Sequence, residues 1–206
     1  MYALVVNNSV TRVFTGPTGF EHNGNQYAPD IFYKWSKAEK EAIGLYEVVT
    51  DSTNRKDEKW YINTNESFAF ANGKVTRSWG TATPKAHADI LFTQQDSDDE
   101  ILPSDKSVGD VKTEGLKTQL IRTIKQQAAG ILQDTDWYIV RKADAGTAVP
   151  SSITTHRAAV RTKAAEMETA ITNASNTPAL ETLYTYTEQE DGSVTRPLGE
   201  LPTLES

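Results

Sequence analysis

Cysteine is absent from the 206 residues, which excludes disulfides, thiolate zinc sites, iron–sulfur clusters and cysteine nucleophiles. Hydrophobic residues make up only 37% of the chain, so we expect a thin core built from small modules or completed by partner chains. No stretch approaches the roughly 20 apolar residues of a membrane span. The first residues, 1–7, lack the basic region of a signal peptide, so we expect cytoplasmic synthesis without an export signal.

Positive charge is scarce, with 21 Lys and Arg against 28 Asp and Glu, a net charge of −7 and a pI of about 5.0. This balance argues against a general nucleic-acid binder and against docking on anionic membranes, because both need a basic surface. Catalytic motifs are also missing: the chain has no glycine-rich phosphate loop, no GxSxG elbow and no HExxH helix. The three histidines, His22, His87 and His156, lie far apart in the sequence. We therefore expect no enzyme, no metal site and no cofactor.

Turn residues between short β-branched or aromatic runs predict three β-hairpins. In the second of them the turn is Asn72-Gly73, the strongest short hairpin signal. Each return strand contains Val-Thr-Arg, which indicates either a weak repeat or simply favourable strand chemistry. A capping box at Ser36 and Glu39 predicts a short helix over 36–42 that stops at Gly44. The expected hairpins pair 2–6 with 10–14, 67–71 with 74–79, and 183–187 with 193–197.

Apolar residues recur at helical spacing in two long segments, which predicts helices over 114–132 and 151–173. We expect these helices to pack antiparallel as a helical hairpin. Between them a short helix over 137–142 would form the corner, with Asp136 as its N-cap. Trp137 would then be buried between the two apolar stripes and serve stability.

Acidic residues are concentrated between Asp89 and Asp110, where seven acids stand against one lysine. This composition predicts a flexible linker or an exposed arm. The expected fold is α+β in three parts: a β-rich module over 1–88, an acidic linker over 89–112, and a helical hairpin with a C-terminal β-hairpin over 113–206.

Three groups of side chains are candidates for contact or for structure. The acids Asp98, Asp99 and Glu100 belong to a run that lacks the glycine and the terminal glutamate spacing of a Ca²⁺-binding EF-hand loop. They either dock a basic partner or form part of a solvated, mobile arm. Trp35, and Trp60 with Tyr61, either contact carbohydrate or protein or fill the core of a small domain.

Two arginines, Arg157 and Arg161, lie one turn apart on the second long helix. We expect them to form structural salt bridges with Asp134, Asp136 or Glu166.

The sequence Thr-Asp-Trp at 135–137, Pro150, and Arg-Ala-Ala-Val-Arg at 157–161 resembles the C-terminal region of phage tail-fibre assembly proteins. His156 stands where that family usually has tyrosine. The N-terminal run 2–7 resembles the small β-rich front domain of phage tail proteins.

This resemblance implies a non-enzymatic structural component of a phage tail, baseplate or tail-fibre network. Such a protein is located in the virion, is oligomeric in the assembly, and has other tail or tail-fibre proteins as partners. Two alternatives remain open: a tail-fibre assembly chaperone, and a host-glycan-binding module suggested by the aromatic clusters. The resemblance brings no catalytic residue.

Overall fold

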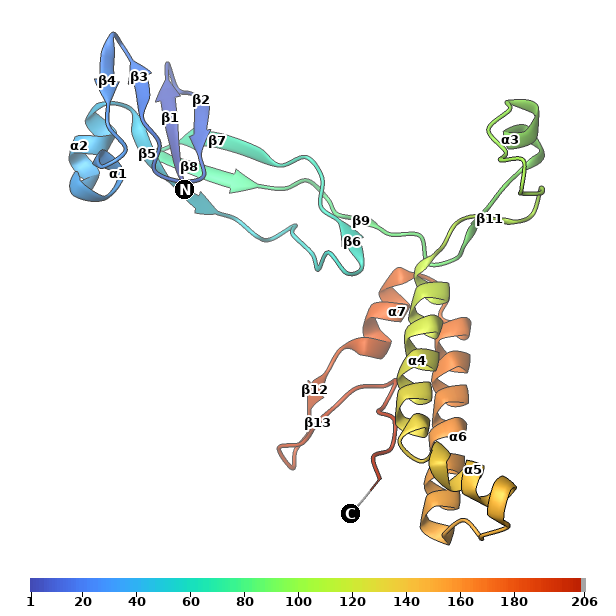
Figure 1. Cartoon of the computed structure of the whole chain (residues 1–206). Helices are drawn as coiled ribbons and strands as arrows, with labels where there is room; N and C mark the ends of the chain where they lie inside the picture. The colour runs from blue at the N-terminus through green and yellow to red at the C-terminus, as the bar shows by residue number, and fades with distance from the viewer. Residues whose placement is uncertain (205–206) are drawn as a thin grey trace. The chain divides into compact units, whose positions relative to one another are not determined.

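The chain has an α+β fold in which the first unit, Met1–Thr83, is β-rich and the second, from Pro84 onward, is mainly helical (Figure 1). The computed structural model describes residues 1–204. A short β-hairpin follows the helices of the second unit, so the predicted fold class is confirmed. The boundary at Thr83 differs from the expected one at residue 88, and the acidic stretch lies inside the second unit.

The first unit is organised around a five-stranded sheet. All neighbouring strands are antiparallel except β5 and β8, which run parallel. The edge strands β2 and β7 contact each other, so the sheet curls toward a barrel. Two predicted hairpins, β1 with β2 and β7 with β8, are confirmed. The strands are, in sheet order, β2 (Ser9–Phe14), β1 (Tyr2–Val6), β5 (Leu45–Thr50), β8 (Lys74–Ser78) and β7 (Ser67–Ala71).

Each hairpin of this unit turns through two residues with positive φ, the geometry that matches the twist of the flanking strands. Asn7 and Asn8 have φ of 51° and 62°, and Asn72 and Gly73 have 52° and 70°. The same turn at Asn23-Gly24 joins β3 (Phe20–His22) to β4 (Asn25–Tyr27). This third hairpin was not predicted, although its sequence signal is the same.

The core of the first unit lies between the sheet and two short helices, α1 (Ile31–Lys34) and α2 (Lys37–Ala42). The predicted capping box is present, because the Ser36 and Glu39 side chains each accept the other residue's backbone N–H. The last short ladder pairs β6 (Tyr61–Ile62) with β9 (Thr83–Pro84). The buried residues of the core are Leu4, Phe14, Phe20, Ile31, Phe32 and Leu45.

Two long helices dominate the second unit, as predicted. Helix α4 (Leu116–Gln133) and helix α6 (Ser151–Asn173) pack side by side in opposite directions, with α5 (Asp136–Ala145) at the corner (Figure 1). Apart from His156, the buried positions of α6 alternate in spacing between four and three residues, the pattern of a coiled-coil seam. The seam residues are Ile153, Arg157, Val160, Ala164, Met167, Ile171 and, just past the helix, Ala174.

A further helix that was not predicted, α7 (Thr177–Tyr184), follows the seam. Its last two residues lie where the strand over 183–187 was expected to begin. Asn176 caps α7 through Ala179 N–H, and Pro178 lies in its first turn, where a missing N–H costs nothing. The C-terminal hairpin is present but shorter than predicted. It pairs β12 (Thr187–Glu188) with β13 (Val194–Thr195).

The acidic stretch, for which the sequence predicts a flexible linker or an exposed arm, carries regular structure. Strands β10 (Ile90–Leu91) and β11 (Val111–Thr113) pair antiparallel, and α3 (Gln94–Asp98) lies between them. We call residues 89–113 the acidic arm. Across residues 1–204, no helix combines the length and apolar character needed to cross a membrane.

Candidate interaction surfaces

The corner of the helical hairpin is built around Arg157, which occupies a seam position of α6 and is only 7% exposed. Its Nη1 donates to Leu132 O at 2.6 Å and to Thr135 Oγ1 at 2.7 Å. Its Nη2 donates to Asp136 Oδ1 at 2.8 Å. The guanidinium therefore satisfies a carbonyl at the C-terminal end of α4, where a cation is favoured, and ties the start of α5 to α6.

The roles expected for Asp136 and Trp137 are corrected by this geometry. Thr135, not Asp136, is the N-cap residue of α5, and Asp136 is the first helical residue, turned toward Arg157. Trp137 is 51% exposed instead of buried between the stripes. The end of the seam is filled by Arg157 and the buried Thr135, so the indole has no apolar space to enter.

Helix α5 contains no buried residue, and its exposed side chains are largely apolar. Ile139 and Val140 are exposed together with Trp137, Val140 to 65%. The ring of Trp137 lies 3.9 Å from that of Tyr138, and the Arg141 guanidinium lies 4.6 Å above the indole. We call the exposed Trp137, Ile139 and Val140 with Arg141 and Lys142 the α5 surface. Clustered aromatic, aliphatic and arginine side chains are typical of protein contact sites.

The two arginines of the second helix differ in role. Arg157 forms the expected ion pair with Asp136. Arg161, one turn later, is exposed, and among residues 1–204 no salt bridge is formed by it. The salt-bridge set predicted for both arginines therefore exists only at Arg157.

The acidic arm is held at its base by the N-terminus of α4. Asp89 accepts from Gly115 N–H at 2.7 Å and from the Thr118 hydroxyl at 2.8 Å. Gly115 is required here, since a Cβ atom would lie 2.3 Å from Ala88 backbone atoms. The arm therefore starts from one end of the helical hairpin, and α5 lies at the other end (Figure 1).

Inside the arm, Asp96 is the central polar group. Its carboxylate forms an ion pair with Lys112 and accepts from the backbone N–H and the hydroxyl of Thr93, both at 2.8 Å. The hydrogen bond from Lys112, then those from Thr93, lower the pKa of Asp96 from 3.8 to about 2. Thr93 and Asp96 form a capping box for α3, and this spacing is the sequence signal that would have predicted the helix.

The outside of the arm combines acids with aliphatic side chains. Asp98, Asp99 and Glu100 are all exposed at the end of α3, the first two accepting from Gln94 and Gln95. The exposed aliphatic residues were not singled out from the sequence, because they are scattered among acids. These residues are Ile90, Leu91, Ile101, Val108 and Val111.

The aromatic candidates of the first unit are not exposed contact residues. Trp60 and Tyr61 are each 3% exposed. Trp35 is half-buried against the core, edge-on to Tyr27 at 6.0 Å. Of the two alternatives left open by the sequence, the structure favours a packing role for these three rings.

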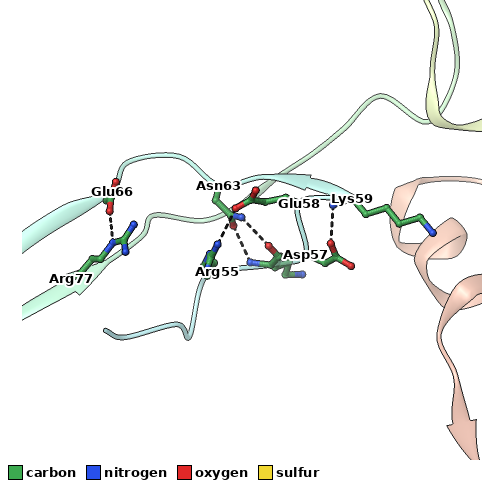
Figure 2. A network of polar contacts seen from close by, with 8 residues as sticks. Arg55, Asp57, Glu58, Lys59, Asn63, Glu66 and Arg77 are labelled. Carbon is green, nitrogen blue, oxygen red and sulfur yellow. Dashed lines mark hydrogen bonds and ion pairs between the residues drawn. The ribbon is translucent and has the colours of Figure 1, made fainter. Parts of the chain in front are cut away.

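The loop before Trp60 and Tyr61 is held by Asn63, which follows these two rings in the chain, and by its own charged groups (Figure 2). The Asn63 amide accepts from Lys56 N–H at 2.9 Å and donates to Lys56 O at 2.8 Å. Arg55 pairs with Glu58, and Asp57 accepts from Lys59 N–H (Figure 2). These charged groups bind one another and stabilise the loop.

Within residues 1–204, no group of three or more His, Cys, Asp or Glu residues is placed to hold a metal ion. Comparison of the chain with models of protein families, with curated proteins and with solved structures finds no match.

Proposed function

We propose that this chain is a structural component of a bacteriophage tail and acts through protein–protein contacts in the tail, baseplate or tail-fibre network. The observation that carries the contact role is helix α5, which buries none of its residues and exposes Trp137, Ile139 and Val140. Several large apolar side chains exposed on one short helix indicate an interaction site. The phage assignment rests on the resemblance of residues 135–161 to tail-fibre assembly proteins.

Residues that carry the resemblance to tail-fibre assembly proteins lie together at the corner of the helical hairpin. Thr135, Asp136 and Arg157 belong to the segments that carry it, and all three meet at the corner. They hold α5 against α6, while Trp137, in the same segment, remains exposed. The motif thus presents an aromatic side chain on a rigid support, which suits a contact site. It supplies no reacting group, so the proposal includes no catalytic role and no cofactor.

The test is the composition of purified particles of the phage that encodes the chain. Mass spectrometry should find the wild-type chain in the particles and much less of a Trp137→Ser, Val140→Ser double variant. A Val194→Ser variant is the matched control, because Val194 is 60% exposed on the C-terminal hairpin, away from α5. Absence of the wild-type chain from the particles would overturn the structural role.

A tail-fibre assembly chaperone is the second candidate. The seam between α4 and α6 is complete within one chain, so the second unit needs no partner for its core. Such a protein can bind a fibre through α5 and then leave it. In that case the chain is missing from particles, and omitting it from co-expression lowers the yield of fibre trimers. The glycan-binding alternative loses its main support, because Trp60 and Tyr61 are buried and Trp35 is half-buried.

A further inference from the structure

The two exposed apolar surfaces of the second unit lie at opposite ends of α4. The acidic arm is fixed to the N-terminal end by Asp89 and Gly115, and α5 is fixed near the C-terminal end by Arg157. Helix α4 has 18 residues, so about 27 Å of helix separates the two ends. An arm anchored at one end does not cover the α5 surface at the other end of its own chain (Figure 1).

The two surfaces are chemically complementary. Both expose aliphatic side chains, such as Ile101 on the arm and Val140 on α5. The tip of the arm adds three exposed acids, Asp98, Asp99 and Glu100.

The charge on the α5 surface has the opposite sign. It carries Arg141 and Lys142, while Asp136, its first acid, is neutralised by Arg157. The remaining acid of α5, Asp144, is exposed and lies one helical turn from Val140 and Arg141. The exposed Lys142 and the half-buried Arg141 are thus the cations that α5 offers to an acidic partner.

We propose that the acidic arm of one copy of this chain docks on the α5 surface of a second copy. This deepens the proposed function, on which it rests, by naming the partner of α5. Apolar contact between the aliphatic side chains supplies affinity, and pairing of the acids with Arg141 and Lys142 fixes the orientation. The open edges of the two-stranded β10–β11 ladder remain available for backbone pairing.

Such a contact is heterologous, because the two surfaces that meet are different. Each copy that docks its arm keeps a free α5 surface, and each copy that is docked upon keeps a free arm. The contact therefore repeats until a ring closes or a filament forms. Repetition of one chain by symmetry is what a tail component requires.

The experiment is sedimentation velocity of the full-length chain over a range of concentrations. The wild type should gain mass with concentration and lose it as salt is raised, because part of the contact is between exposed charges. An arm variant, Ile101→Ser with Val108→Ser, and an α5 variant, Ile139→Ser with Val140→Ser, should each remain monomeric. Circular dichroism checks that both are folded, which we expect because all four side chains are exposed.

Mixing the two variants gives the decisive result. The intact arm of the α5 variant can dock on the intact α5 of the arm variant, and no second contact is possible. The mixture should form a species of two chains that does not grow further, while the Val194→Ser control assembles like the wild type.

A wild type that is monomeric at every concentration would overturn the inference, as would a mixture that stays monomeric or variants that still self-associate. Charge reversal gives a second measurement if a serine variant is unfolded: Asp98→Lys with Asp99→Lys, and Arg141→Glu with Lys142→Glu, should assemble only when mixed. If the chain does not self-associate, the proposed function can still be tested by mass spectrometry of the particles. Incorporation that depends on α5 would then mean that α5 binds a partner other than a second copy of this chain.

Discussion

Arg157 and Asp136 are 21 residues apart in the chain, yet their side chains meet at 2.8 Å at the corner of the helical hairpin. The guanidinium is buried, whereas the carboxylate is 55% exposed. The pair is thus a buried cation held by a partly hydrated acid and by two uncharged acceptors, Leu132 O and the Thr135 hydroxyl. If Arg157 is removed, Leu132 O and the Thr135 hydroxyl both lose their hydrogen bond from the guanidinium. If the Asp136 carboxylate is removed, the guanidinium keeps these two acceptors.

We expect Arg157→Ala to lower the free energy of unfolding of the second unit by about 3 kcal/mol, because it breaks a buried polar network and leaves a cavity. Asp136→Asn should cost less, about 1 kcal/mol. Arg161→Ala is the matched control and should change it by no more than about 0.5 kcal/mol, since Arg161 is exposed. Urea unfolding followed by circular dichroism measures all three. Equal effects of the two arginine variants would contradict the proposed corner.

Alanine substitutions at Gly115 and Gly130 should change the stability of the second unit in opposite directions. Gly115→Ala places a Cβ atom 2.3 Å from the backbone of Ala88, so the base of the arm must shift, at a cost of about 1–3 kcal/mol. Gly130→Ala, inside α4 with open space around it, should stabilise the helix by about 0.5–1 kcal/mol. Thermal unfolding of the two variants checks both signs. A stabilised Gly115→Ala chain would mean that the arm is not seated on α4.

The acidic arm should loosen only in strong acid. Asp96 has an ordinary pKa of 3.8 when unfolded and about 2 when folded, so its contribution to stability is complete above about pH 4 and is lost as pH falls through about 2. A carbon-13 titration of the Asp96 carboxyl group by NMR, with the Ile101 methyl signals as reporters of the arm, measures this. Asp96→Asn should loosen the arm at neutral pH, and Asp105→Asn, at an exposed site, should not. Titration of Asp96 near 3.8 would contradict the ion pair with Lys112.

Much of the regular structure could be predicted because local chemistry decides it. The Asn72-Gly73 turn, the Ser36 capping box and the periods of α4 and α6 each depend on neighbours within a few residues. The hairpin at Asn23-Gly24 carries the same local signal, although it was not among the predicted hairpins. Helix α7 was not predicted, although a proline in the first turn, such as Pro178, is itself a signal for a helix start.

The candidate site was harder to predict because it depends on contacts distant in the sequence. Seam spacing places position 157 inside the helical hairpin, where an apolar residue is the usual expectation. Only the folded corner shows that the arginine reaches Leu132 O and Thr135, and that Trp137 is consequently displaced to the surface. The exposure of the aliphatic side chains in the arm was equally hard to predict. They are exposed because β10 and β11 form a sheet of only two strands, and no periodicity in the sequence indicates this.

Substitutions at the exposed Trp137 and at the buried Met167 should have different effects on the free energy of unfolding of the second unit. The indole contacts Tyr138 and the Arg141 guanidinium, and exposed contacts of this type are worth about 0.5–1 kcal/mol, so Trp137→Ala should change the free energy of unfolding by no more than about 1 kcal/mol. Met167 lies in the seam and is 1% exposed, so Met167→Ala should cost about 2–5 kcal/mol. Urea unfolding at a chain concentration low enough to prevent self-association measures both.

Fluorescence adds an independent measure of the same surface. The other three tryptophans, Trp35, Trp60 and Trp79, belong to the first unit and are buried or half-buried, so the emission lost in a Trp137→Phe variant isolates the exposed indole. That difference signal should be red-shifted and readily quenched by acrylamide. It should shift to the blue when chain concentration is raised, since an arm docked on α5 covers the indole. A loss of about 3–5 kcal/mol in Trp137→Ala, the cost of truncating a buried tryptophan, would instead place the indole inside the corner and remove α5 as a contact surface.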